Sequence, residues 1–117
     1  MGTDSQRDLF PGALEMMVLQ TLGRQPLHGY AIAKTLKETS ADLLAIEEGS
    51  LYPALQRMLR AKWVKAEWGL SSRNRRVRIY SITPKGLTQL EEQRSSYERM
   101  LQGIGLVMKA AEQGADS

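Results

Sequence analysis

Residues 48–62 read EGSLYPALQRMLRAK, and the rest of the chain is best interpreted as a scaffold for the helix that this segment predicts. With a period of 3.6 residues, four apolar side chains fall on one face of the helix and are expected in the core. These side chains are Leu51, Ala54, Leu55 and Met58, with Leu59 at the edge. The opposite face carries hydrogen-bonding and cationic groups without an acid: Pro53, Gln56, Arg57 and Arg60, flanked by Ser50 and Tyr52. That face suits a negatively charged groove, although an ordinary solvated helix can have the same pattern.

The start of this helix is predicted at Ser50, whose hydroxyl suits the first unpaired amide groups. Pro53 would then lie in the first turn, where its missing amide hydrogen costs no hydrogen bond. We therefore expect a short helix that Ser50 caps.

Charge is segregated along the chain. The net charge of the 117 residues is only +3, and the length fits one small domain that would gain burial by dimerising. Residues 57–78 hold eight lysines and arginines against the single acid Glu67, whereas residues 87–117 hold three against five acids. A concentrated basic segment beside a mildly acidic one indicates that one face binds a polyanion. A membrane surface is the weaker alternative.

The sequence lacks the marks of several other classes. Without cysteine there is no disulfide framework and no thiolate nucleophile. No apolar run approaches the roughly 20 residues of a spanning helix, and no secretory pattern follows Met1, so we expect a cytoplasmic protein. There is no Gly-rich phosphate loop, and His28 is the only histidine. We therefore predict neither an enzyme, a metal site nor a cofactor, and expect His28 to pack or hydrogen-bond at a helix start.

The N-terminal part is expected to begin with a flexible arm, residues 1–10, before a helix over Ala13–Leu22. This helix is apolar nearly all round, and such a helix needs cover on more than one side. We therefore expect a partner subunit to cover it and assign Leu14 and Met17 to that contact.

Short elements are predicted on both sides of the central helix. A second helix is expected over Leu27–Thr39, followed by a connection with apolar side chains packed beneath it. The packed side chains would be Leu43, Leu44 and Ile46. Trp63–Trp68 and Val77–Ile82 have the β-branched and aromatic content of strands, and the arginine-rich loop 69–76 between them is interpreted as a wing. Trp63 and Trp68 are expected in the core at the wing root, with ligand stacking as the alternative.

A long final helix is predicted over residues 84–111, because Thr83 suits an N-cap and Pro84 the first helical position. Its apolar residues recur at alternating steps of three and four, which is the seam of a helix that pairs with another helix. The seam comprises Leu87, Leu90, Tyr97, Leu101, Ile104, Met108 and Ala111, and only Arg94, between Leu90 and Tyr97, interrupts it. We favour self-association over packing on the same domain, expect Tyr97 and Met100 to line a cavity between the paired helices that can bind an effector, and expect residues 112–117 to form a disordered tail.

These elements predict an α+β, mainly α fold, a winged helix-turn-helix over residues 11–83 with a long C-terminal dimerisation helix. Four motifs resemble PadR-type transcriptional regulators over about residues 9–90: PLHGYAIA (26–33), EGSLYPAL (48–55), EWG (67–69) and YSITPKG (80–86). The resemblance implies the smaller subfamily, in which one C-terminal helix packs against a partner subunit. It also implies a dimeric regulator, usually a repressor, that a small molecule often releases.

Two departures from the family pattern have structural consequences. Lys62 stands where the family usually has a glycine at the end of the recognition helix, so positive φ is expected there at a cost of roughly 1 kcal/mol. Ala13 replaces a frequent capping threonine. The final helix also contains no tryptophan, which some relatives use to stack aromatic drugs, so an effector pocket of that design is not expected.

We predict a sequence-specific regulator that binds a pseudo-palindromic operator in double-stranded DNA as a homodimer and is released by a small apolar or aromatic effector. Phosphate contacts are assigned to Ser50, Tyr52 and Lys34, base edges to Pro53, Gln56 and Arg57, and wing contacts to Arg73, Arg75 and Arg76, with Arg60 completing the DNA-binding set. The alternatives are a winged helix that binds an acidic protein partner, and an RNA-binding or architectural DNA protein.

Overall fold

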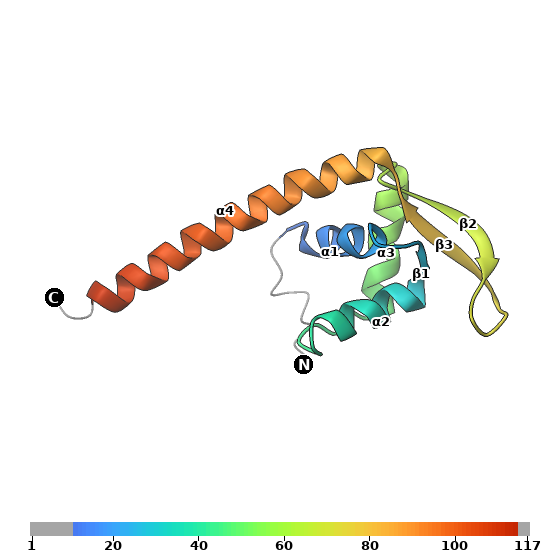
Figure 1. Cartoon of the computed structure of the whole chain (residues 1–117), viewed down its shortest axis with the longest axis horizontal. Helices are drawn as coiled ribbons and strands as arrows, with labels where there is room; N and C mark the ends of the chain where they lie inside the picture. Colours follow the sequence, from blue (N-terminus) through green and yellow to red (C-terminus); the bar gives the residue numbers. More distant parts are fainter. Residues whose placement is uncertain (1–10, 115–117) are drawn as a thin grey trace.

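The structure is a computed structural model that describes residues 11–114. Three helices surround a core, a small antiparallel sheet flanks them, and a long helix leaves the domain (Figure 1). The elements are α1 (Ala13–Leu22), β1 (Leu27–His28), α2 (Gly29–Thr39), α3 (Glu48–Arg60), β2 (Val64–Leu70), β3 (Arg76–Ile82) and α4 (Pro84–Gly114). The predicted fold class, α+β and mainly α, is confirmed.

The core forms where the buried face of α3 meets α1, α2 and the sheet. The predicted face of α3 is confirmed, because Leu51, Ala54, Leu55 and Met58 all have an exposed fraction of 0%. Tyr80 and Val64 close the core from the sheet side. At about 1.5–3 kcal/mol for each fully buried large apolar side chain, this stripe fixes how α3 sits on the domain.

Helix α1 lies in the middle of the domain and is covered within the chain. It packs against α2, α3, α4 and β3, and seven of its ten residues are buried. The inference that a partner must cover it is therefore wrong for most of the helix. Leu14 lies in the chain's own core, whereas Met17 is half-buried against its edge.

The sheet has three strands in the order β1-β3-β2, rather than the two strands expected. Leu27 and His28 do not start α2 but pair with Tyr80 and Ile79 of β3. The hairpin of β2 and β3 is also longer than predicted, so the loop between them shrinks to residues 71–75. The extra strand and the longer hairpin both depend on backbone pairing with β3. The residues involved have a composition that is also compatible with helix or loop, so the sequence did not predict the pairing.

Helix α3 begins earlier than expected. Its N-cap is the extended residue Glu47, whose carbonyl accepts hydrogen bonds from the amides of Ser50 and Leu51, and no side chain caps the helix. The predicted Ser50 cap is therefore wrong. Pro53 consequently lies one turn further in, on the exposed face, where water can reach the carbonyl that its missing amide leaves without a bond. In the preceding connection Ile46 is buried as expected, but Leu43 is 82% exposed.

Helix α3 ends at a left-handed residue, as the sequence predicted. Lys62 has a φ of 65° and donates its amide to Leu59, while the Trp63 amide reaches back to the carbonyl of Met58. These two bonds form a Schellman motif, which usually has glycine at the left-handed position. A lysine there carries a steric cost that glycine would not.

Thr83 joins the end of α3 to the start of α4. Its hydroxyl accepts the amide of Gly86 at 3.0 Å, which confirms the predicted cap, and lies 2.7 Å from the Lys62 carbonyl, to which it can donate. Gly86 must lack a side chain here, because a Cβ would lie 2.1 Å from the Trp63 carbonyl oxygen. The first turn of α4 therefore packs directly on backbone.

Helix α4 changes character along its length. Its first half packs on the domain and buries Leu90, so Leu90 belongs to the intrachain core and not to a free seam. Residues 101–114 are exposed and extend past the other elements (Figure 1). The helix runs to Gly114, three residues further than predicted. The predicted arm, residues 1–10, and residues 115–117 of the predicted tail lie outside the described residues.

Replacing Lys62 with Gly is expected to raise the free energy of unfolding by about 1 kcal/mol, because glycine adopts positive φ without the clash of a Cβ. Urea denaturation measures this change. Lys62→Ala is the control, since it removes the charge but keeps the Cβ and should give no such gain. An equal gain in both variants would assign the effect to the lysine charge and contradict backbone strain.

Candidate nucleic-acid interface

The outer face of α3 presents the residues singled out from the sequence, with two additions. Pro53, Gln56 and Arg60 are exposed and lie opposite the buried stripe. The earlier start of the helix adds Gly49 and Glu48 to the exposed surface, so the face is not free of acid as expected. A Cβ at Gly49 would meet open space, so the fold itself does not require glycine there.

Tyr52 borders this face on the side of α2 and the sheet. Its ring lies so close to Gly29 that a Cβ there would be 2.8 Å from the ring atoms. Burial raises the pKa of the Tyr52 phenol, and the charge of Glu48 and a hydrogen bond to it raise it further. The phenol is therefore held neutral as a hydrogen-bond donor, and Ser50, half-buried in the first turn, lies nearby in sequence.

Arg57 borders the face on the opposite side and is tied to α1. Its Nε and one terminal nitrogen both donate to the same carboxylate oxygen of Glu15, at 3.2 and 2.8 Å. Arg57 is 53% exposed, whereas Glu15 is only 16% exposed. The expectation that Arg57 reaches base edges does not fit this arrangement, because the guanidinium is held sideways against α1.

The wing turn is short and internally hydrogen-bonded. The Ser71 amide donates to the Arg75 carbonyl, and the Ser71 hydroxyl accepts the amides of Arg73 and Arg75. Asn74 adopts a φ of 63°, a conformation that asparagine tolerates better than most residues. The turn therefore holds Arg73 and Arg75 at its tip, and Arg76 begins β3.

Trp68 is exposed on the hairpin rather than buried at its root. Its exposed fraction is 61%, while Trp63 is half-buried against the core. The guanidinium carbon of Arg76 lies 4.4 Å from the Trp68 ring centroid, and that of Arg78 lies 5.9 Å away. The expectation of a wing-root core residue is therefore wrong for Trp68. Sequence reasoning missed this cluster because only the strand register pairs Trp68 with Arg78.

Most basic residues in the described range, 11–114, have no carboxylate partner within that range. Within residues 11–114, ion pairs join only Arg57 to Glu15 and Arg94 to Glu91. The arginines of the wing are thus unpaired within the described part of the chain. Lys34 is exposed on α2, where it lines a surface groove of about 510 Å³ together with Lys37, Glu47 and Glu48.

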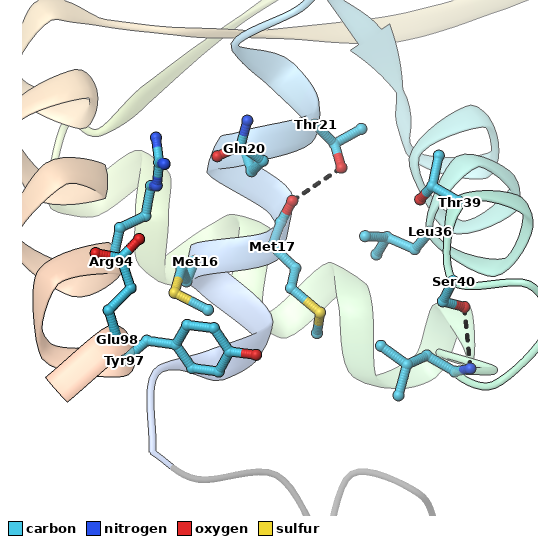
Figure 2. A pocket seen from close by; sticks show the side chains of 11 residues that line it. Met16, Met17, Gln20, Thr21, Leu36, Thr39, Ser40, Arg94, Tyr97 and Glu98 are labelled. Carbon is cyan, nitrogen blue, oxygen red and sulfur yellow. Dashed lines mark hydrogen bonds between the residues drawn. The ribbon is translucent and has the colours of Figure 1, made fainter. Parts of the chain in front are cut away.

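Two hollows flank Tyr97, which the sequence analysis placed at an effector cavity. Figure 2 shows the larger one, of about 420 Å³, between Tyr97, Arg94 and Glu98 of α4 and the side chains of α1, with Thr39 and Ser40 of α2 opposite. The smaller one, of about 320 Å³, is lined by Tyr97, Met100 and Gln93. The side-chain oxygen Oε1 of Gln93 is buried without a hydrogen-bond partner among the described residues.

Among residues 11–114, none of the helices combines the length and the apolar composition that a membrane span requires. No group of three or more histidine, aspartate or glutamate side chains in the same residues could hold a metal ion.

Comparison with known proteins identifies relatives of the whole architecture. A family model described as the Transcriptional regulator PadR-like family matches residues 18–92. A transcriptional regulator from Clostridium thermocellum is 25% identical, with a TM-score of 0.75, over 90% of this chain and 95% of that one. A PadR-like transcriptional regulator from Bacillus cereus is 30% identical, with a TM-score of 0.72, over 83% and 92% of the two chains.

A further structural neighbour was solved with bound DNA. Bacillus subtilis PadR in complex with operator DNA is 20% identical, with a TM-score of 0.62, and the match covers 69% of this chain and 46% of that one. At this identity the likeness is one of fold.

Proposed function

This chain belongs to the PadR-like family of transcriptional regulators, and we propose that it binds duplex DNA with the outer face of α3 and with the wing. The family consists of regulators and not of enzymes. The observation that carries the proposal is the set of unpaired arginines on the hairpin beside a helix whose exposed face offers Gln56 and Arg60. Such an arrangement complements a polyanion whose grooves admit a helix.

Individual roles follow from where each side chain lies. Gln56 and Pro53, at the centre of the outer face, contact base edges in the major groove. Arg60, Lys34, Ser50 and the neutral phenol of Tyr52 contact phosphates. Arg73, Arg75 and Arg76 contact the adjacent backbone or minor groove. Arg57 leaves the base-contact set and instead braces α3 against α1 through Glu15.

The structure of Bacillus subtilis PadR with operator DNA supports DNA binding, though not the individual roles, by analogy of fold. We further propose that the chain represses transcription from a pseudo-palindromic operator. A two-fold symmetric dimer presents two recognition helices about one helical turn apart, so each meets an equivalent half-site.

We propose that two copies pair through the second half of α4. Leu101, Ile104 and Met108 of the seam are each about half exposed or more, and the exposed Val107 flanks them. A lone helix with this much exposed apolar surface needs a partner. Tyr97 and Met17, both half-buried, and the exposed Leu87 in the first turn of α4 are proposed to extend the contact towards the domain, whereas Leu14 and Leu90 are left out because the chain itself covers them.

A small apolar or aromatic effector is proposed to bind beside Tyr97 and Met100. The two hollows there lie between the DNA-binding domain and α4, so a ligand can couple helix position to DNA affinity.

Duplex DNA binding is expected to weaken steeply with salt. A plot of the logarithm of the binding constant against the logarithm of the salt concentration should have a slope near −7 if a dimer uses four cations per subunit.

Gln56→Ala should weaken binding to an operator selected from genomic fragments by about 1–3 kcal/mol of binding free energy, but should have little effect on binding to a random duplex. Fluorescence anisotropy titrations measure both, with Gln102→Ala on α4 as the control. Failure of the unmodified protein to bind duplex DNA at low salt would contradict the proposal and favour an acidic protein partner.

Ile104→Glu should convert a dimer into a monomer, because it places a charge in the apolar contact. Light scattering coupled to gel filtration measures the mass of each species. The matched control is Gln102→Glu, which adds the same charge on the other side of the helix and should leave the dimer intact. A monomeric unmodified protein at micromolar concentration is the result that rules out pairing.

Tyr97→Ala should reduce binding of the aromatic dye 1-anilinonaphthalene-8-sulfonate several-fold, because Tyr97 lines both hollows. Dye fluorescence titrated against folded protein measures this, and Tyr30→Ala, an exposed tyrosine on α2, is the control. Equal dye binding by both variants and the unmodified protein would place any effector site elsewhere.

A further inference from the structure

The wing carries an alternating series of rings and cations on one face. In the antiparallel register, Trp68 lies opposite Arg78, and its neighbours Ala66 and Leu70 lie opposite Tyr80 and Arg76. Opposed residues of paired strands share a face. The order from tip to root is therefore Arg76, Trp68, Arg78 and Tyr80, with the guanidinium of Arg78 also 6.0 Å from the Tyr80 ring.

This face is the one that packs on the helices at the hairpin root. Val64 and Tyr80 belong to it and are buried in the core, whereas Trp68 and the two arginines lie further out, where the hairpin projects past the helices (Figure 1). On the opposite face Ile79 covers Gly69, where a Cβ would lie 2.5 Å from the Ile79 Cδ1 atom. The two faces of the hairpin are therefore chemically distinct.

Neither arginine of the series has a carboxylate within 4 Å in the described chain. The nearby Glu67 alternates to the other face of β2, so it does not neutralise them. A flexible arginine loses rotamer freedom when it binds an anion, and a ring that already holds the guanidinium reduces that loss. The exposed Trp68 ring contacts both guanidinium groups, and neither arginine has a carboxylate partner in residues 11–114. The ring is therefore suited to hold the two arginines in place.

We propose that Trp68 is a positioning residue that holds Arg76 and Arg78 on its ring so that both guanidinium groups meet the phosphate backbone of the bound duplex. The inference rests on the proposed DNA binding and deepens it. It assigns a phosphate contact to Arg78. It also gives a role to Trp68, whose exposed ring does not form part of the core.

Trp68→Leu should weaken duplex binding roughly two- to fivefold, the effect of losing an exposed cation–π contact, while Trp68→Phe, which keeps a ring, should retain most of the affinity. In an Arg76→Ala/Arg78→Ala background, Trp68→Leu should change affinity no further. Anisotropy titrations on one duplex at fixed salt measure all of these variants, and urea midpoints verify that each is folded.

Three results separate the possibilities. An equal loss from Trp68→Leu in both backgrounds would mean that Trp68 contacts the nucleic acid itself, which overturns the positioning role. Unchanged affinity of Trp68→Leu in the otherwise unmodified protein also overturns it. Failure of the unmodified protein to bind the duplex would instead refute the proposed function.

Discussion

The arrangement of this molecule depends on the complete burial of one apolar stripe on α3. Leu51, Ala54, Leu55 and Met58 have no exposed surface, and they are held between α1, α2 and the sheet. A helix fixed in this way can turn in neither direction without exposing one of them to water. The side chains on its far surface, Gln56 and Arg60 among them, are thereby aimed outward with a fixed geometry.

The ends of α3 are fixed by backbone contacts as firmly as its middle is by packing. Lys62 accepts a left-handed conformation so that the chain can turn sharply into β2. Thr83 then links this turn to α4 by hydrogen bonds, and Gly86 lets the long helix lie against the Trp63 backbone. One small junction therefore sets the positions of the α3 end, the wing and α4 relative to each other. The junction therefore connects α4 directly to the end of α3 and to the start of β2.

Much of the candidate interface could be predicted because its signals are local. The buried stripe of α3 and the Thr83 cap depend on spacing and on the chemistry of single residues, whereas the positive φ of Lys62 was implied by the resemblance to PadR-type regulators, in which glycine is usual at this position. The resemblance of four motifs to PadR-type regulators is likewise confirmed by the family match. Two features of α3 could not be predicted in this way. The N-cap is Glu47, three residues before the predicted cap Ser50, because the Glu47 carbonyl already accepts the first amide groups. The contact of Arg57 with Glu15 joins residues 42 apart in sequence, so the spacing within α3 does not predict it.

The amino-acid sequence alone was enough to predict the fold class, the approximate positions of most elements and the location of the basic residues, because periodicity, capping and turn chemistry act over a few residues. Only the tertiary structure decided which apolar residues are covered within the chain. Leu14 and Leu90 are buried by their own domain, whereas Leu101, Ile104 and Met108 are exposed. It also decided that Trp68 meets Arg76 and Arg78, since strand register is a property of two paired segments and not of either one alone.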